Sequence, residues 1–469
     1  MKLSTAALSA LDIPTPAYDR TRVTPGIVHI GVGAFHRAHQ AVHVDDVLAI
    51  DGVSDWGIVG VGLLPGDADA VARSRSQDHL YCLTTVDPDG TDHTRVVGSI
   101  IDHLHSPADA GRIMDLLSSP EIRIVSLTIT EGGYNLDEAL PHVGEQPPGT
   151  AWGVLTEALR RRRDAGVPPF TVLSCDNIQH NGDVARAVLT GFARAVDEQL
   201  GDWIEANVAF PNSMVDRITP QLTPDVALDL RQRYGIDDAW PVRSESFTQW
   251  VIEDRFPAGR PPLERVGAQL VADVAPFEKM KLRLLNASHQ VMSHLGLLAG
   301  FTMVHEACHD ETFARYIRRY MTREAIPTLD PVPGIDLAAY CDRLMARFGG
   351  SRLADTLARQ VVDSSDRITK FLVPVIADQL RAGRDIECAC LVLAAWRRRI
   401  LAGGDLTDRR ADELREWAMR DEADPGAFLR FAPVFGELGD DDRLRTSWRD
   451  AVALLDEHGA AAAVARLAA

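Results

Sequence analysis

Three polar side chains with apolar residues between them lie close together in residues 279–290. They are Lys281, Asn286 and His289, and no glycine or proline interrupts the segment before Gly296. At about 100° per residue, an α-helix would place Asn286 ~140° and His289 ~80° from Lys281, so all three would project from one side. An amine, an amide and an imidazole on one apolar helix can form a small polar site in dry surroundings.

Burial would give the lysine a chemical use. Desolvation disfavours the ammonium form, so a buried Lys281 can act as a base near neutral pH. An amide such as that of Asn286 can stabilise a developing alkoxide, and His289 can exchange a hydrogen bond with a hydroxyl. The spacing alone leaves a second interpretation open, because lysines at helix edges are often solvated, and Asn and His often cap or bridge helices.

The composition is that of an acidic globular protein with two domains. Its 469 residues exceed what one hydrophobic core usually holds. A net charge of -18 opposes binding to nucleic acid or to anionic membranes, and no run of 18 apolar residues predicts a membrane span. The six cysteines lack CxxC spacing, which predicts reduced thiols in a cytoplasmic protein. The acidic surface allows a monomer.

Residues 26–41 have the pattern of a strand, a glycine turn and a helix. A β-branched run ends at Gly31-Val-Gly33, and a helix-like segment follows. A dinucleotide-binding fingerprint requires this context, because the glycines let backbone N–H groups approach a pyrophosphate. His36 occupies the place of the usual third glycine, and Arg37 is a candidate phosphate partner. A purely structural turn is the alternative.

A second buried run, residues 56–63, is followed by Asp67. An acidic residue after the second strand of a dinucleotide-binding domain holds the ribose diol and repels a 2′-phosphate. Asp67 therefore favours NAD over NADP. Arg73 and Arg75 follow soon after and can shift this balance.

Alternating strand-like and helix-like runs continue to about residue 273. The strand-like runs are 81–85, 123–129 and 170–175, and the helix-like runs are 108–117, 152–163 and 183–200. This alternation predicts an α/β N-terminal domain of the Rossmann type, residues 1–273. From Val274 onward, Ala/Leu/Arg-rich stretches predict a largely α-helical C-terminal domain, residues 274–469, with Lys281 on its first long helix.

Two polar segments follow predicted strands, and a third forms a separate loop. Residues 130–134 read Thr-Glu-Gly-Gly-Tyr, and residues 174–182 read Ser-Cys-Asp-Asn-Ile-Gln-His-Asn-Gly. Ligands of open α/β sheets bind beyond the carboxyl ends of strands, so both are candidate binding loops, with ordinary turns as the alternative. Residues 210–220 are expected to form a compact loop in which Asp216 and Arg217 stand side by side.

Together these segments resemble the polyol-specific long-chain dehydrogenases, the mannitol dehydrogenase family. The matching blocks are 31–39, 130–134, 174–177, 212–220 and Lys281-x4-Asn286-x2-His289, and they occur in the family's order. The resemblance implies zinc-independent oxidation of a secondary alcohol by NAD, with ketose reduction as the reverse reaction and no metal site.

The resemblance also implies roles for single residues. Lys281 matches the general base, and Asn177 and Asn286 match the pair that polarises the reacting oxygen. His289 matches a substrate-orienting catalytic residue, and Glu278 matches a carboxylate implicated in proton passage. The positions that match the cofactor site are Gly31, Gly33, Ala34, Phe35, His36, Arg37, Asp67 and Glu131.

The expected substrate-binding residues are Asp216, Arg359 and Arg367. Arg367 occupies a neighbouring position that is often basic in the family. The segment around it, Asp363-Ser-Ser-Asp-Arg-Ile-Thr-Lys370, departs from the family pattern Gly-Ser-Ser-Lys/Arg-Ile-Pro-Lys. This departure affects the expected distal end of the substrate pocket.

Oxidation of mannitol to fructose is the expected activity within the family. Relatives that reduce uronates tend to carry a basic residue in the loop at 131–134, because a cationic side chain can bind a carboxylate with two hydrogen bonds. Gly132 offers no such side chain. Reduction of fructuronate or tagaturonate and oxidation of arabinitol or sorbitol are the alternatives. The presence of every expected catalytic side chain argues against a non-catalytic NAD-binding protein.

Overall fold

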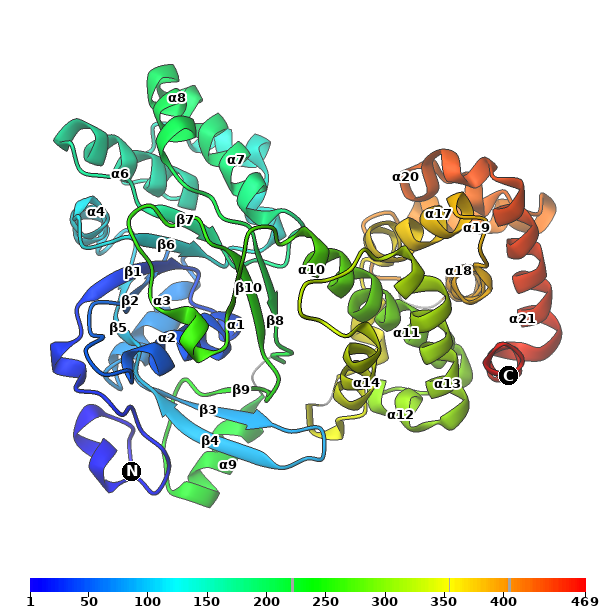
Figure 1. The fold of residues 1–469 in the computed structure, drawn as a ribbon, viewed down its shortest axis with the longest axis horizontal. Coiled ribbons are helices and arrows are strands. Elements are labelled where there is room, and N and C mark those ends of the chain that lie inside the picture. Colours follow the sequence, from blue (N-terminus) through cyan, green and yellow to red (C-terminus); the bar gives the residue numbers. More distant parts are fainter. Residues whose placement is uncertain (221–222, 354, 404–405) are drawn as a thin grey trace. The chain divides into compact units, whose positions relative to one another are not determined.

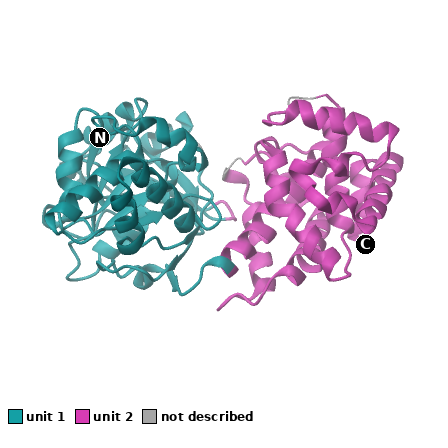
Figure 2. Ribbon diagram, turned by 90° about the horizontal axis from the view of Figure 1, so that it is seen from above, with its two compact units in different colours: residues 1–87, 91–275 teal, residues 88–90, 276–469 magenta. Residues whose placement is uncertain are grey.

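The computed structural model describes residues 1–220, 223–353, 355–403 and 406–469, which form two units (Figures 1 and 2). Unit 1 consists of Met1–Asp87 and Thr91–Ala275, and unit 2 of Pro88–Gly90 and Pro276–Ala469. The break after Ala275 falls close to the boundary predicted between residues 273 and 274. The assignment of cofactor binding to the first domain and catalysis to the second stays a prediction.

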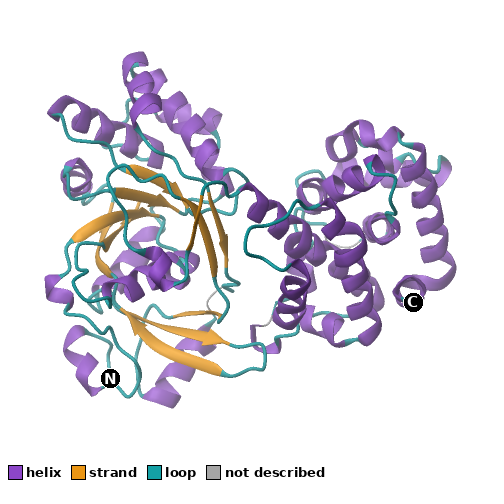
Figure 3. Cartoon of the chain, in the orientation of Figure 1, coloured by secondary structure: helices purple, strands orange, loops and turns teal. Residues whose placement is uncertain are grey.

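A five-stranded parallel sheet forms the centre of unit 1 (Figure 3). Its order is β5-β2-β1-β6-β7, so the order reverses between β1 and β6. Dinucleotides bind at such reversals, beyond the carboxyl ends of the strands. The strands are β1 Pro25–Ile30, β2 Gly57–Gly62, β5 Ile100–His105, β6 Ile124–Leu127 and β7 Thr171–Ser174.

Apolar side chains cover both faces of this sheet. Val28 and Val59 belong to one core and Ile27 and Ile58 to another, so successive residues of a strand point into different cores. Burial on both faces explains the continuous apolar run that predicted β2. The helices of unit 1 are α1 Ala34–Ala38, α2 Gln40–Leu48, α3 Asp67–Arg75, α4 Ala110–Ser118, α5 Leu136–Ala139, α6 Ala151–Ala165, α7 Asn181–Val196, α8 Glu198–Asn207 and α9 Pro224–Tyr234.

Two three-stranded sheets complete unit 1, with the orders β4-β3-β9 and β11-β10-β8. The run predicted at 81–85 is β3, which pairs with β4 and β9 and not with the parallel sheet. The segment 210–220, expected as a loop, contains β8, which pairs antiparallel with β10. The strands are β3 Tyr81–Val86, β4 Asp92–Val97, β8 Ser213–Asp216, β9 Val242–Glu245, β10 Gln249–Glu253 and β11 Gln269–Val271.

Unit 2 is built from helices around α11, Ala287–Ala299. This helix is buried from Ala287 to Gly296 and packs against α15, α18 and α21. The other helices are α10 Ala275–Met280, α12 Val304–His309, α13 Glu311–Arg319, α14 Leu337–Phe348, α15 Leu357–Gln360, α16 Ser364–Arg367, α17 Val373–Arg381, α18 Glu387–Leu401, α19 Ala411–Ala423, α20 Ala432–Phe435 and α21 Asp442–Ala468. The predicted fold class, an α/β Rossmann-type domain with a largely helical second domain, is confirmed.

π-Helical turns interrupt the helices of unit 2 at Lys281–Asn286, Tyr320–Ala325 and Ile368–Leu372. The first of these turns contacts both of the others. A π-turn carries hydrogen bonds between residues five apart and is often found at functional sites. The prediction of one regular α-helix through residues 279–290 was therefore wrong between 281 and 286. Across the described ranges, no helix combines the length and the apolar character needed to cross a membrane.

Candidate active site

The turn after β1 requires glycine at position 31. The backbone of Gly31 has φ +94°, and a Cβ atom there would lie 2.2 Å from the carbonyl oxygen of Thr128. The Gly33 N–H donates to the Gly31 carbonyl at 2.8 Å, and Gly33 directly precedes α1. The turn thus brings the end of β1 into close contact with the end of β6, as a dinucleotide-binding turn does.

A cavity of about 440 Å³ opens beside this turn. Its walls come from the ends of β1 and β2, the loop after β6 and the first turn of α6. Of the predicted cofactor positions, Gly31, Gly33 and Asp67 line it, whereas Ala34, Phe35, His36, Arg37 and Glu131 are not among its lining residues. A turn with glycine at positions 31 and 33, beside a cavity at the reversal of strand order, fits a dinucleotide.

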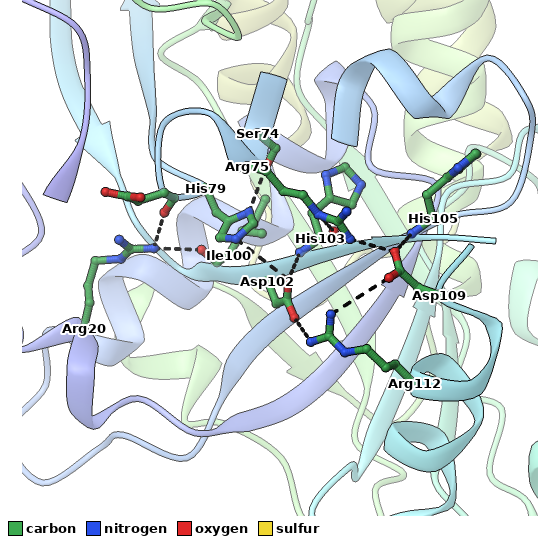
Figure 4. A network of polar contacts seen from close by, with 11 residues as sticks. Arg20, Ser74, Arg75, His79, Ile100, Asp102, His103, His105, Asp109 and Arg112 are labelled. Carbon is green, nitrogen blue, oxygen red and sulfur yellow. Dashed lines mark hydrogen bonds and ion pairs between the residues drawn. The ribbon is translucent and has the colours of Figure 1, made fainter. Parts of the chain in front are cut away.

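Asp67 begins α3 at the cavity wall. Its Oδ2 accepts the Leu64 N–H at 2.9 Å, which fixes the carboxylate beside the end of β2. Arg75 lies at the other end of the same helix (Figure 4). Its guanidinium donates to Asp109 at 2.7 Å and to the His103 carbonyl at 3.0 Å. Arg75, one of the two arginines that could have opposed Asp67, is therefore paired with a carboxylate of its own.

Arg37 is buried beneath the turn. It donates to the carbonyls of Trp240 and, at 3.2 Å, Pro241, and its guanidinium lies 4.1 Å from the Trp240 ring centre. Burial lowers the pKa of Arg37 to about 10, so it remains a cation. Its cationic group is engaged with protein carbonyls, and its predicted role as a phosphate partner stays a prediction.

Asp176 joins the two candidate binding loops of unit 1. Its carboxylate accepts the N–H groups of Ile129 and Thr130, each at 2.9 Å, and the Tyr134 hydroxyl at 2.7 Å. Burial raises the pKa of Asp176, while these three donors oppose the shift. Thr130 has φ +63° and ψ 166°, a conformation that β-branched residues rarely adopt, and Asp176 holds it there. The loop that carries Asn177 is thus fixed to the loop after β6.

Asn181 and β8 are hydrogen-bonded to the loop that carries Asn177. The Asn181 amide donates to the carbonyls of Ser174, Asp176 and Ser213, at 3.2, 3.0 and 2.8 Å. Ser213 begins β8, the strand that ends at the buried Asp216. Asn177 and Asp216 are therefore both carried by one hydrogen-bonded framework in unit 1.

In unit 2, the π-turn carries Lys281 and Asn286 at its two ends, and His289 follows on α11. All three are buried, with exposed fractions of 7, 8 and 8%, and Glu278 lies three residues before Lys281 at 5%. A π-turn holds more than four residues, so residues five apart approach the same face. The irregular turn thus brings Lys281 and Asn286 closer in direction than the predicted α-helix would.

Charged groups surround His289. Burial lowers the pKa of His289 to about 4; Asp355 opposes this shift, and Arg359, Arg347 and Arg367 add to it. The imidazole is therefore neutral at neutral pH. A neutral ring can accept a hydrogen bond on one nitrogen and donate from the other.

Asp355 positions the predicted substrate arginine. Its Oδ1 accepts Arg359 Nε at 3.0 Å and Nη2 at 2.9 Å, and its Oδ2 accepts Gln360 Nε2 at 2.8 Å. The Gln360 carbonyl accepts Gln290 Nε2 at 2.9 Å, which ties α15 to the neighbour of His289. Sequence reasoning did not single out Asp355, and its i,i+4 spacing from Arg359 is the signal that points to it.

The segment that departs from the family pattern forms a turn before α16. Asp363, at its start, has φ +49°, a left-handed backbone conformation. The N–H and hydroxyl of Ser365 donate to Asp408 at 2.7 and 2.8 Å, and Thr369, in place of proline, donates to the Ser365 carbonyl at 2.7 Å. Arg367 follows at the end of α16. These hydrogen bonds hold the turn that leads into α16.

A parallel α/β unit with a cavity at its glycine turn, and a helical unit with a buried lysine, asparagine and histidine, define a two-domain dehydrogenase. The chain belongs to the mannitol dehydrogenase family. The family's Rossmann-domain model matches residues 25–265, and its C-terminal-domain model matches residues 273–455.

Relatives match the chain along its whole length. A mannitol 2-dehydrogenase of Phaeosphaeria nodorum is 41% identical, with 100% of this chain and 86% of the relative covered. The Pseudomonas fluorescens mannitol 2-dehydrogenase, solved as a ternary complex with NAD and D-mannitol, is 40% identical with a TM-score of 0.87 over 100% of this chain and 99% of that one. A substrate-free D-sorbitol dehydrogenase is 36% identical with a TM-score of 0.91, covering 99% and 100%.

These matches confirm the predicted family and the predicted dehydrogenase class, and the predicted cofactor, NAD, is the one named in the Pseudomonas complex. In the part of the chain that the structure describes, no three His, Cys, Asp or Glu side chains are grouped to hold a metal ion. All six cysteines are free thiols.

Proposed function

We propose that this protein is an NAD-dependent, zinc-independent polyol dehydrogenase that oxidises mannitol to fructose, with Lys281 as the general base. One observation carries the proposal: the buried Lys281, Asn286 and His289 share one π-to-α segment. The full-length match to a mannitol 2-dehydrogenase that binds NAD and D-mannitol supports it.

Lys281, buried at the start of the π-turn, takes the proton of the substrate hydroxyl. Asn286 donates a hydrogen bond to the alkoxide that remains, and the family resemblance assigns Asn177 the same role. Bound NAD would supply the hydride acceptor. Glu278, three residues before Lys281, passes the proton on toward solvent, and the neutral His289 orients a neighbouring hydroxyl.

The cofactor site belongs to unit 1. Gly31 and Gly33 let the backbone approach the pyrophosphate, and the fixed Asp67 carboxylate binds the ribose diol. A 2′-phosphate would meet the negative charge of Asp67, and Arg75 is held by Asp109. These contacts support NAD over NADP.

A neutral polyol fits the substrate side better than a uronate. Asp355 neutralises Arg359, so the pair offers hydrogen bonds to hydroxyls without a net charge for a carboxylate. Gly132 adds no side chain to the loop after β6. Sorbitol is the second candidate substrate, because a D-sorbitol dehydrogenase shares the fold with a TM-score of 0.91. Fructuronate, tagaturonate and arabinitol rank behind these two.

A substrate panel tests the proposal directly. Purified protein is assayed with mannitol, sorbitol, arabinitol, fructose and fructuronate, each with NAD(H) and NADP(H), before and after treatment with a chelator. The expected result is strong NAD-dependent mannitol oxidation that survives chelation. Loss of activity on chelation would refute zinc independence. Stronger turnover of sorbitol or fructuronate would make that compound the proposed substrate in place of mannitol.

We also infer a monomer that works in the cytoplasm. The strong negative charge and the free thiols support this inference. Light scattering on the purified protein tests the first part, since a particle of twice the 51.3 kDa chain mass would contradict it.

A further inference from the structure

A buried chain of polar side chains runs beneath the glycine turn of unit 1. His29, on β1, is fully buried and has its Nδ1 2.8 Å from Ser126 Oγ and its Nε2 2.8 Å from Thr128 Oγ1. The Thr128 hydroxyl donates to the Gly31 carbonyl at 2.6 Å. At the other end, Ser126 Oγ lies 2.8 Å from the side-chain amide of Gln40 on α2. The chain therefore links α2, β6 and β1 to the turn.

The protons along this chain can be counted. Because Thr128 gives its hydroxyl proton to Gly31, the proton between Thr128 and His29 must come from Nε2 of His29. With Gln40 Oε1 facing Ser126, the serine proton goes to Gln40, and His29 would have to donate from both nitrogens as a cation. With the Gln40 amide turned over, Ser126 donates to Nδ1 and the ring is neutral.

The neutral arrangement is the one that burial favours. His29 has no exposed surface, and its hydrogen-bond partners are hydroxyl and carbonyl groups, none of them an anion. Burial lowers the pKa of His29 to about 3. A neutral His29 gives a single direction of donation, from Gln40 through Ser126, His29 and Thr128 to the Gly31 carbonyl.

His36 completes the arrangement from the helix side. It takes the place of the third glycine of the dinucleotide fingerprint, whose usual task is close packing of helix on strand. Its ring stacks on His29 with 3.5 Å between ring centres and 14° between ring planes. Both ring nitrogens of His36 are buried without a hydrogen-bond partner within the described residues, so its flat face makes the contact. The stacked pair provides the close packing here.

We propose that Ser126 and His29 are positioning residues for the dinucleotide: they act through Thr128 on the Gly31 carbonyl and so fix the shape of the cofactor turn. The Gly31 carbonyl accepts from both the Thr128 hydroxyl and the Gly33 N–H, at 2.6 and 2.8 Å, so it joins the chain to the turn itself. Neither Ser126 nor His29 lines the cavity, so any effect they have on cofactor affinity is indirect.

Binding of NADH to the full chain, without any polyol, tests the proposal. Ser126→Ala removes the link between Gln40 and His29. Ser99→Ala is the matched control, because Ser99 is equally buried in unit 1 and donates to the Ala41 carbonyl at 2.6 Å. This hydrogen bond does not belong to the chain of hydrogen bonds from Gln40 to Gly31. The dissociation constant of NADH is measured by fluorescence for both variants and the wild type, together with their thermal unfolding.

Ser126→Ala should raise the NADH dissociation constant by roughly 3- to 10-fold, the effect of one broken hydrogen bond, while Ser99→Ala leaves it within about twofold. Equal dissociation constants for Ser126→Ala and wild type, or an equal loss in both variants, would overturn the proposal. The proposal rests on the cofactor site and not on the identity of the polyol, so failure of mannitol oxidation with intact NADH binding leaves it standing.

The tautomer of His29 gives a second measurement that needs no variant. In ¹⁵N-labelled protein, the nitrogen shifts of His29 should show a neutral ring protonated on Nε2 from about pH 5 to 9. A ring protonated on Nδ1, or on both nitrogens, would contradict the proposed direction of hydrogen-bond donation, whatever NADH affinity is measured for Ser126→Ala.

Discussion

The two units hold their proposed functional residues by different means. In unit 1 the proposed cofactor residues and Asn177 follow the ends of parallel strands, and side chains such as Asp176 fix the loops by accepting backbone N–H groups. In unit 2 the proposed catalytic residues Lys281, Asn286 and His289 share one helical segment, and a π-turn sets the spacing of Lys281 and Asn286. A loop can adapt to a large cofactor, whereas a helix keeps the residues of the proton transfer rigidly spaced. Substitutions in the two units should therefore fail in different ways.

The largest expected effect separates chemistry from cofactor binding. Lys281→Ala should lower kcat by at least ~10²-fold, the lower range for a positioned acid–base group, and leave the NADH dissociation constant within about twofold. Lys279→Ala is the control, because Lys279 lies two residues earlier, is a third exposed and pairs with Asp330 at 3.1 Å. Lys279→Ala should retain the kcat of the wild type. Steady-state kinetics and NADH titration measure both, and full turnover in Lys281→Ala would remove the proposed base.

The next effect concerns the glycine turn. Gly31→Ala should weaken NADH binding by at least ~10-fold, because its Cβ would collide with the Thr128 carbonyl and the turn must move. Gly52→Ala shares the left-handed backbone, with φ +81°, but its Cβ would meet nothing within 4 Å. The left-handed backbone should cost each variant ~1–2 kcal/mol of stability, Gly31→Ala should lose more because of the collision, and only Gly31→Ala should lose NADH affinity. Equal NADH binding in the two would show that the turn does not position the cofactor.

A smaller effect is expected on the substrate side of unit 2. Asp355→Asn keeps the shape of the side chain but releases the charge of Arg359. The KM for mannitol should rise by roughly 3- to 10-fold, the loss of a charge-assisted hydrogen bond that orients Arg359, and NADH affinity should not change. The ratio of fructuronate to mannitol activity should rise. Asp330→Asn, at an exposed ion pair, is the control, and identical KM values in the two variants would contradict a positioning role.

The sequence predicts unit 1 better than unit 2 for physical reasons. The strand and glycine-turn patterns of β1 and β2 are local, and both elements form as predicted. β5 was missed because Asp102, His103 and His105 break its apolar pattern, although it is the third strand of the parallel sheet along the chain. The order of Lys281, Asn286 and His289 marks the second unit, but their π-turn leaves no pattern that distinguishes it from an α-helix. Asp355 was missed although its i,i+4 spacing from Arg359 points to the pair, because the same spacing is common among ion pairs on exposed helix faces.

Acid should weaken unit 2 through His289. Burial lowers its pKa from the ordinary 6.5 to about 4, so the unfolded chain binds a proton more readily in that interval. The contribution of the neutral His289 to the free energy of unfolding is complete above pH 6.5 and is lost as the pH falls through 4. His289→Phe should therefore show a smaller drop in Tm between pH 7 and pH 4.5 than the wild type, by a few degrees. Thermal unfolding at several pH values measures this, and parallel curves for the two proteins would contradict it.

The smallest effect is expected at Asp363. Its left-handed backbone, φ +49°, is a conformation that glycine adopts freely and aspartate tolerates. Its N–H donates to the Thr407 carbonyl at 2.8 Å, and glycine keeps this bond. Asp363→Gly should therefore change the free energy of unfolding, and the activation free energy that kcat reports, by no more than ~1 kcal/mol. Asp363→Ala should be less stable than Asp363→Gly and the wild type. Calorimetry ranks the three proteins. A tenfold loss of activity in Asp363→Gly would show that the carboxylate itself acts on the substrate.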